Sequence, residues 1–290
     1  MRKGSRIKVN DSSKTPGLTI SVVSYDPNLN FLKQTLEAAC KASRRALREG
    51  VLSEVDLLMV DNGPGGGWRE KIQAVLDEVW CTETVGPVEI HPAKRNLGYG
   101  RGHNLGILRC RKRYYLVLNP DAVMDEDALV EATQFMEANS EVGMLAPRVR
   151  AGAGDNQHLC KEDPNMADLF LRGFTPRWLQ ARFQKRLDRY AIANMKIDEP
   201  RIGLPVLSGC FLYCRTRALQ QAGGFDPRYF LYFEDNDLSR MVRKSAPLAY
   251  QPKVVIEHFG GGASRKGLAH IRMFCVSAWK YFRKHGWRWK

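Results

Sequence analysis

Residues 114–130 read YYLVLNPDAVMDEDALV, and this stretch decides which class of fold we predict. Its first five residues form a continuous apolar run, which is typical of a strand buried on both faces. Pro120 has no backbone N–H and a fixed φ, so it ends the hydrogen-bond ladder of this strand. We therefore predict a buried strand whose carboxyl end carries a single carboxylate, Asp121, ahead of a helix.

Similar apolar runs recur through the first half of the chain, and a helical pattern follows most of them. Strands are predicted at residues 18–25 (LTISVVSY), 55–60 (VDLLMV), 88–91 (VEIH), 114–118 (YYLVL) and 142–147 (VGMLAP). Helices are predicted to open at Asp26-Pro27, at Trp68, after a glycine-rich turn, and at an Asp125 cap leading to Asn139. This alternation predicts an α/β fold with a mostly parallel central sheet flanked by helices.

The regular alternation of strand and helix patterns ends after Pro147. Residues 165–193 are helical, basic and aromatic, and residues 204–214 (LPVLSGCFLYC) have the pattern of one strand. A short helix is predicted at residues 216–223, a second helix opens at the acids within residues 233–245, and residues 253–258 (KVVIEH) form a last strand. The chain is predicted to end in a basic amphipathic helix.

Composition limits the class of protein. The chain has 290 residues, of which 44% are hydrophobic, enough for one substantial core. The 45 Lys and Arg residues outnumber the 31 Asp and Glu residues, and the net charge of +14 favours a polyanionic partner: nucleic acid, anionic lipid or a phosphorylated molecule. No apolar run approaches about 18 residues, so no transmembrane helix is predicted. The N-terminus lacks the apolar core of a signal peptide.

Seven scattered cysteines without a C-x-x-C pair predict free thiols in a reduced compartment, the cytosol. Nucleic acid is disfavoured as the partner because the sequence contains no helix-turn-helix, zinc-finger or ribonucleoprotein pattern.

Polar residues follow several predicted strands at the point where each strand ends. These residues are Asp26, Asp61-Asn62, residues 119–121 and His258. In open α/β sheets, ligands bind beyond the carboxyl ends of the strands. A carboxylate there can hold Mg²⁺ or Mn²⁺ against phosphates, and a histidine nitrogen suits Mn²⁺ better. The alternatives are that Asp121 is only a turn or cap residue and that His258 is a structural histidine.

A second cluster lies in YFLYFEDNDLSR, residues 229–240. Aromatic residues lead into Glu234, Asp235 and Asp237, and an apolar environment raises a carboxyl pKa as a general base requires. The alternative is that these acids only complement the dipole of a helix N-terminus.

The glycine-rich turn carries glycines at 98, 100, 102 and 106. Their spacing gives neither the dinucleotide fingerprint nor a P-loop. The nearby residues Arg95, Asn96 and Arg101 indicate contact with an anion or a sugar.

Together these stretches resemble the family 2 glycosyltransferases of the GT-A fold, in particular the bacterial rhamnosyltransferase branch. The matching segments span most of residues 18–264: TISVVSYD, LLMVDNGPGGG, NLGYGRGHNLGI, YYLVLNPDAVM, LSGCFLYCRTRALQQAGGFDPRYFLYFEDNDLSRMVRK and VVIEHFGGGAS. The block around GGFDPRYFLYFEDNDL is the most specific of them.

The resemblance implies an inverting sugar transfer from a nucleotide-diphospho-sugar, with no enzyme nucleophile. Asp61 would contact the base, Asp121 would bind Mn²⁺ or Mg²⁺ on the diphosphate, and His258 would be a further metal ligand. Asp235 would be the catalytic base, and Glu234 is the second candidate. The expected nucleotide-sugar pocket also includes Ser24, Asp26, Asn62, Arg95, Asn96, Gly98, Arg101, Asn119, Ser208 and Gly209.

The sequence departs from the family pattern at three places. Asn119 stands where many relatives carry an aspartate, which leaves one firm metal carboxylate. The first strand ends in SYDP rather than SYN, and DNGPGGG has a glycine where serine is common.

From the resemblance we expect dTDP-L-rhamnose as donor and a hydroxyl of a lipid-linked or growing surface polysaccharide as acceptor. Alternatives are a UDP-sugar donor, or a non-catalytic scaffold module that binds polyanions.

We expect a leader at 1–17, a catalytic domain at 18–264 with a nucleotide half (18–148) and an acceptor half (149–264), and the basic helix at 265–290. Basic residues and tryptophans in that helix are typical of an interfacial anchor, which suggests a peripheral position on the cytoplasmic face of the inner membrane. The alternative is a helix packed on the core.

Overall fold

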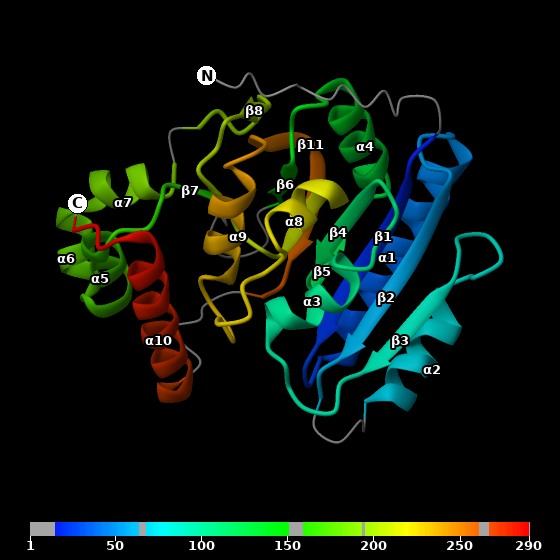
Figure 1. Ribbon diagram of the computed structural model, residues 1–290, viewed down its shortest axis with the longest axis horizontal. Coiled ribbons are helices and arrows are strands. Elements are labelled where there is room, and N and C mark those ends of the chain that lie inside the picture. Colours follow the sequence, from blue (N-terminus) through cyan, green and yellow to red (C-terminus); the bar gives the residue numbers. More distant parts are fainter. Residues whose placement is uncertain (1–14, 64–67, 151–158, 193–194, 261–266, 290) are drawn as a thin grey trace, which may run out of the picture.

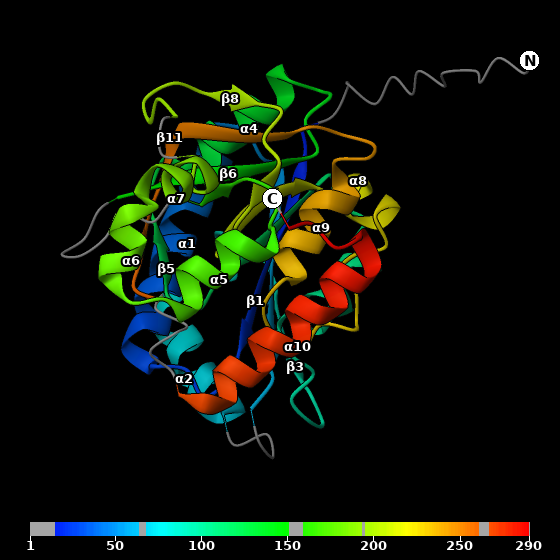
Figure 2. The same cartoon turned by 90° about the vertical axis from the view of Figure 1, so that its left-hand side faces the viewer.

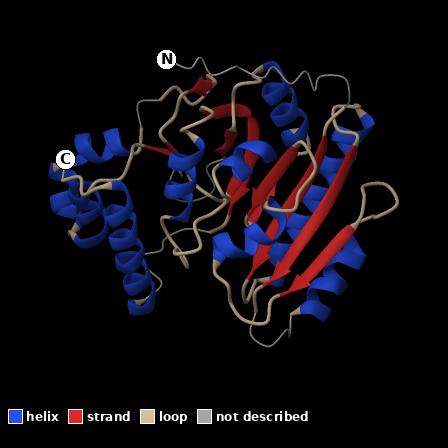
Figure 3. Ribbon diagram, in the orientation of Figure 1, coloured by secondary structure: helices blue, strands red, loops and turns tan. Residues whose placement is uncertain are grey.

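A computed structural model of the chain describes residues 15–63, 68–150, 159–192, 195–260 and 267–289. Most of the predicted leader therefore lies outside the described residues, as do parts of the glycine segments after Asn62 and Phe259. A central sheet is flanked by helices (Figures 1 and 3). The helices within residues 166–190 and 268–285 form a helical group at one side of the sheet. This confirms the predicted α/β class.

The main sheet contains nine strands in the order β3-β2-β1-β4-β10-β6-β11-β5, with β8 beside β11. The strands are β1 (Gly17–Ser24), β2 (Glu54–Asp61), β3 (Val88–Pro92), β4 (Tyr114–Leu118), β5 (Ala122–Met124), β6 (Met144–Val149), β8 (Arg201–Ile202), β10 (Phe211–Arg215) and β11 (Leu248–His258). A separate ribbon pairs β7 (Cys160–Lys161) with β9 (Val206–Leu207).

The helices are α1 (Leu29–Arg48), α2 (Arg69–Val79), α3 (Tyr99–Ile107), α4 (Ala128–Ala138), α5 (Met166–Phe174), α6 (Arg177–Arg182), α7 (Gln184–Tyr190), α8 (Thr216–Gln221), α9 (Glu234–Val242) and α10 (Leu268–His285). Strands β3, β2, β1 and β4 are all parallel, as the alternating pattern predicts. The other half is mixed: β10 is antiparallel to β4 and β6, while β6 and β11 are parallel.

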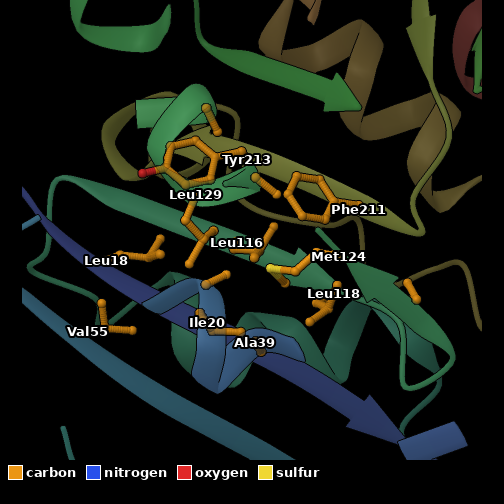
Figure 4. Packing of buried hydrophobic residues seen from close by; sticks show 14 of the residues in the cluster. Leu18, Ile20, Ala39, Val55, Leu116, Leu118, Met124, Leu129, Phe211 and Tyr213 are labelled. Carbon is orange, nitrogen blue, oxygen red and sulfur yellow. The ribbon is translucent and has the colours of Figure 1, made fainter. Parts of the chain in front are cut away.

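The core lies on both faces of the sheet because side chains of β4 alternate between them. Tyr114, Leu116 and Leu118 join a cluster with residues of α1, α2 and α4, part of which Figure 4 shows. Tyr115 and Val117 join the opposite cluster with residues of α3, α8 and α9. A strand buried on both faces needs the continuous apolar run seen in the sequence.

Two predicted helix starts are wrong. Helix α1 begins at Leu29 rather than at Pro27, because Asn28 Oδ1 accepts from the backbone N–H groups of Asn30 (3.0 Å) and Phe31 (3.3 Å). Helix α4 begins at Ala128 after Asp127, not after Asp125. The missed strand β5 ends just before Asp125, whose N–H donates to the carbonyl of Val255 (3.0 Å).

Two predicted elements are divided. Residues 165–193 form three short helices, with Pro176 at the N-cap of α6, and residue 193 lies outside the described part. Residues 204–214 form not one strand but β9 and β10, separated by a turn at residues 208–210. This turn separates the ribbon from the main sheet, and it is the centre of the site described below.

Candidate active site

Buried polar residues lie at the carboxyl ends of β1 and β2. Asn62 N–H donates to the carbonyl of Ser24 (2.8 Å), and Asp61 Oδ1 accepts from Gly63 N–H (2.9 Å). Ser24, Asp61 and Asn62 are all buried. Within the described part of the chain, Ser24 Oγ and Asp61 Oδ2 are buried atoms without a hydrogen-bond partner. A ligand group with polar atoms of its own would offset this cost.

The side chain of Asn62 also fixes the glycine-rich turn beside the end of β2. Its Nδ2 donates to the carbonyl of Gly98 (3.0 Å), and its Oδ1 accepts from Leu97 N–H (3.0 Å), while Asn96 Oδ1 accepts from Gly98 N–H (2.9 Å). Gly98 has φ +84°, and a Cβ there would lie 2.3 Å from the carbonyl oxygen of Phe230. Glycine is needed here because the chain is left-handed and its backbone meets another backbone.

Three of the residues expected at the nucleotide lie on the surface. Asp26 is exposed with φ 48° at the end of β1, and Arg95 is exposed between β3 and α3. Arg101 is exposed and its Nε donates to the carbonyl of Pro227 (2.6 Å). Arg101 thus supports the loop before α9.

Asp121 and His258 come together at the other strand ends. Their side chains approach to 3.3 Å between Oδ1 and Nε2, and Asn119 Nδ2 lies 3.2 Å from the same nitrogen. Phe259 N–H donates to the carbonyl of Asp121 (3.0 Å), so β11 fixes the pair. A Cβ at Gly260 would lie 2.4 Å from Asp121 Oδ2 and 2.9 Å from His258 Nε2. A glycine backbone therefore closes one side of the pair.

This pair fits a divalent cation whose remaining ligands come from a substrate. Asp121 Oδ1 is buried without a hydrogen-bond partner among the described residues, and it faces an imidazole nitrogen. No group of three or more His, Cys, Asp or Glu side chains able to hold a metal occurs in the described residues. Mg²⁺ and Mn²⁺ are commonly held by one or two protein ligands together with phosphates and water.

The turn at residues 208–210 joins the two halves of the site. Asn119 N–H donates to the carbonyl of Cys210 (2.9 Å), and Tyr99 Oη donates to the carbonyl of Gly209 (2.5 Å). On the opposite side, Gly209 N–H donates to Asp235 Oδ2 (3.1 Å). The turn thus links the Asp121 side to Asp235 at the start of α9.

The two candidate bases differ in exposure. Asp235 is partly exposed, and its Oδ1 accepts from the backbone and side chain of Asn236 (both 2.8 Å). Glu234 is 6% exposed, and burial, followed by the charge of Asp235, raises the pKa of Glu234 to about 8. The acid pair follows Tyr232 and Phe233, whose φ values of 69° and 66° are rare for residues with a side chain. Such strain is concentrated at functional sites.

Asp237, the third acid of the cluster, has a structural role. It is 1% exposed, and Lys284 Nζ and His285 Nε2 of α10 lie 2.7 Å and 2.6 Å from its Oδ1. Tyr281 and Phe282 of α10 are buried in one cluster with Tyr229 and Phe233. One face of α10 therefore packs on the segment that carries the candidate base.

Sequence reasoning missed two polar residues of this site, Tyr99 and Lys161. Lys161 Nζ donates to Ser208 Oγ (2.9 Å) from the ribbon strand β7. A two-residue strand has no recognisable period, so nothing in the local sequence places this lysine beside residue 208. Tyr99 could have been identified from the sequence, because it places a hydroxyl group inside the glycine-rich segment that is expected to contact a ligand.

A parallel half-sheet with polar strand ends, joined to an acid-bearing helix across a turn, defines the GT-A class of glycosyltransferases. Solved structures share this fold. S. aureus TarS (residues 1–349) is 15% identical with a TM-score of 0.53, over 83% of this chain and 59% of that one. The mannosyltransferase PcManGT from Pyrobaculum calidifontis, in complex with GDP-Man and Mn²⁺, is 14% identical with a TM-score of 0.58, over 93% of this chain and 65% of that one. The chain thus spans less than two thirds of these solved proteins.

The chain belongs to the glycosyltransferase like family 2, whose sequence model matches residues 16–289. Two similar relatives are N-acetylglucosaminyl-diphospho-decaprenol L-rhamnosyltransferases of Mycobacterium tuberculosis, from strains CDC 1551 / Oshkosh and ATCC 25618 / H37Rv. Each is 27% identical over 297 residues, which covers 94% of this chain and 87% of the relative. In the part of the chain that the structure describes, no helix is long and apolar enough to cross a membrane.

Proposed function

We propose that this chain is an inverting rhamnosyltransferase that moves L-rhamnose from dTDP-L-rhamnose onto a hydroxyl group of a lipid-linked glycan. The observation that carries the proposal is the position of Asp235, which the turn at residues 208–210 links to the Asp121–His258 pair. A base and an anchor for a leaving diphosphate are the two groups that direct displacement at a sugar carbon requires. The named activity of the two Mycobacterium tuberculosis relatives supports the sugar and the acceptor class.

In this proposal the donor nucleotide lies along the ends of β1, β2 and β4. Asp61 and Ser24 offer buried polar atoms to the base and ribose, and Asn62 fixes the turn that borders them. Asp121 and His258 would hold Mn²⁺ or Mg²⁺, which supplies positive charge at the diphosphate when bound. Asn119 orients this pair through its contact with His258 Nε2.

Asp235 acts as the base because it is the accessible member of the acid pair. Its carboxylate takes the proton of the acceptor hydroxyl while that oxygen forms a bond to the anomeric carbon of the donor sugar. The bond between that carbon and the diphosphate breaks, the nucleoside diphosphate leaves with the electron pair, and the configuration inverts. Glu234 is buried and its pKa of about 8 keeps it protonated near neutral pH, so Glu234 is poorly suited to accept a proton from the acceptor hydroxyl.

We further propose that helices α5, α6 and α10 rest on anionic lipid at the cytoplasmic face of the inner membrane. Figures 1 and 2 show α5 beside α10, and Met166 N–H donates to the carbonyl of Arg288 (2.9 Å). Large apolar side chains of this group are exposed: Phe170 60%, Trp178 71%, Leu268 84%, Trp279 49% and Trp289 68%. Arg283, the exposed basic residue in the last turn of α10, lies over the ring of Trp279, and a cation beside exposed tryptophans suits an anionic lipid surface.

The test of the function is transfer itself. The purified chain with Mn²⁺ is incubated with dTDP-L-rhamnose or UDP-glucose and with N-acetylglucosaminyl-diphospho-farnesol, and products are identified by mass spectrometry. We expect a rhamnosylated lipid from dTDP-L-rhamnose. Transfer from UDP-glucose alone would identify a UDP-sugar enzyme, and no transfer from either donor would favour the scaffold alternative.

A further inference from the structure

The ribbon of β7 and β9 brings a lysine to the acceptor side of the site. Lys161 pairs with Val206 in the antiparallel register, and its Nζ donates to Ser208 Oγ (2.9 Å). Ser208 precedes Gly209, whose N–H donates to Asp235 Oδ2 (3.1 Å). The ammonium group and the candidate base are therefore held on adjacent residues of one turn.

The surroundings of Lys161 leave its charge poorly compensated. Burial lowers the pKa of Lys161, the nearby Arg172 of α5 lowers it further, and the charge of Asp235 acts in the opposite direction. Among the described residues, the side-chain ammonium of Lys161 has no carboxylate partner within ion-pair distance, and it donates to the neutral hydroxyl of Ser208. A half-buried cation without a paired anion costs free energy, and an anionic ligand would offset that cost.

The position of Lys161 indicates which substrate carries that anion. In the proposed function the donor diphosphate lies at Asp121 and His258, which contact the turn through Asn119 and Cys210. Lys161 contacts the turn at Ser208, next to the attachment of Asp235, where the acceptor hydroxyl must lie. Arg172 lies exposed on α5, the helix that also exposes Phe170. Helix α5 thus carries both a second cation and an exposed aromatic side chain.

We propose that Lys161, assisted by Arg172, binds the diphosphate of the lipid-linked acceptor and so places its sugar hydroxyl at Asp235. This inference rests on the proposed function, and it adds the part of the substrate that Lys161 recognises. It explains why a lysine is kept half-buried beside a catalytic base, and why the second cation comes from α5.

The test compares two acceptors that differ in charge. Wild type, Lys161→Met, Lys161→Arg and the control Lys196→Met, whose side chain is 75% exposed, are assayed with N-acetylglucosaminyl-diphospho-farnesol and with uncharged octyl N-acetylglucosaminide. For Lys161→Met we expect the KM of the diphosphate acceptor to rise at least tenfold, with the KM of the uncharged acceptor and of dTDP-L-rhamnose unchanged. Lys161→Arg should recover most of the loss, and Lys196→Met should match wild type.

Two kinetic results would overturn the inference. An equal loss with both acceptors would mean that Lys161 acts on Asp235 or on the sugar, and a raised KM for the donor alone would place it at the donor diphosphate. Binding of farnesyl diphosphate without donor, followed by thermal shift, separates this inference from the proposed function. If no variant transfers sugar, a shift in wild type that Lys161→Met lacks still supports the anion site, and no shift in wild type contradicts it.

Discussion

At the scale of single residues, the proposed chemistry depends on Asp235 and on the Asp121–His258 pair. They are separated in sequence, but three hydrogen bonds to backbone groups of the turn at residues 208–210 link them. Asn119 N–H and the Tyr99 hydroxyl donate to carbonyls of this turn, and the Asp235 carboxylate accepts from Gly209 N–H. The sequence predicts each of the three side chains from its place after a strand or at a helix start. It does not predict Lys161, because the contact with Ser208 depends on the pairing of two very short strands.

The substitution Asp235→Asn should abolish the base without disturbing the turn, because an amide oxygen can still accept from Gly209 N–H. General-base catalysis contributes on the order of 10²–10⁴-fold, so we expect kcat to fall by about that factor while donor affinity is unchanged. The matched control is Asp198→Asn, whose side chain is 77% exposed and pairs with Arg148. Turnover within a few-fold of wild type would remove Asp235 as the base.

The substitution Asp121→Ala should remove metal-dependent nucleotide binding. A ligand that binds only the folded state raises the melting temperature by mass action, so we would measure Tm with dTDP, UDP, GDP and CDP, each with Mn²⁺ and with EDTA. Wild type should gain stability from a pyrimidine diphosphate only with Mn²⁺, and Asp121→Ala should not. Asp127→Ala, with a side chain 65% exposed, is the control. If the Mn²⁺-dependent rise in Tm of Asp121→Ala equals that of wild type, Asp121 does not hold the cation and is only a turn residue.

The glycine after the last strand gives a second test of the same pair. Gly260→Ala would place a methyl group against both Asp121 and His258, so it should weaken the Mn²⁺-dependent shift. The Tm without ligand should change little, because this residue lies outside the hydrophobic clusters. A normal Mn²⁺-dependent shift would mean that the pair does not hold the cation.

At the scale of elements, the parallel half of the sheet could be predicted and the other half could not. Continuous apolar runs identify β1, β2 and β4, because strands buried on both faces carry no polar alternation. Strand β10 enters the sheet antiparallel between β4 and β6, which follows from long-range packing rather than from its sequence. Strand β5 has three residues and pairs with β11, so it was too short to detect.

The start of α9 should make stability depend on pH. The folded pKa of Glu234, about 8, is above its ordinary value of 4.5. Between these values the folded protein holds a proton that the unfolded chain has released, so stability falls as pH rises from about 4.5 through about 8. Glu234→Gln stays neutral and should reduce this fall, which Tm at pH 5.5 and pH 8.5 would measure. The exposed Glu70→Gln should behave as wild type, and a wild-type slope in Glu234→Gln would contradict the assignment.

Helix α10 supports α9 through contacts with Asp237 and Phe233. Removing one partner of a buried ion pair typically costs about 3–5 kcal/mol, so Lys284→Met should lower the free energy of unfolding by up to that amount through the loss of its pair with Asp237. Urea unfolding would measure the change, with exposed Lys244→Met as control. For the same reason, deletion of residues 268–290 should destabilise the protein as well as weaken membrane binding. If Lys284→Met lowers the free energy of unfolding no more than Lys244→Met does, the Lys284–Asp237 pair does not stabilise the packing of α10 on α9.

At the scale of the whole molecule, helices α5, α6 and α10 lie beside the sheet domain (Figure 2). Among the described residues, the exposed tryptophans lie on α6, on α10 and just after α10: Trp178, Trp279, Trp287 and Trp289. Trp178→Ser combined with Trp289→Ser should reduce sedimentation with vesicles that contain phosphatidylglycerol. Wild type should bind these vesicles better than phosphatidylcholine vesicles, and salt should weaken the binding. Leu108→Ser, at a side chain 62% exposed elsewhere, is the control. Equal binding by the double variant would remove this face as the membrane contact.

Transfer of L-rhamnose by direct displacement inverts the anomeric configuration, and the stereochemistry of the product tests this directly. The product formed from dTDP-L-rhamnose and N-acetylglucosaminyl-diphospho-farnesol would be analysed by NMR for the configuration of its new glycosidic bond. We predict a configuration opposite to that of the donor, in a product that the Asp235→Asn variant does not form. A bond with the configuration of the donor would contradict direct displacement by an acceptor that Asp235 deprotonates.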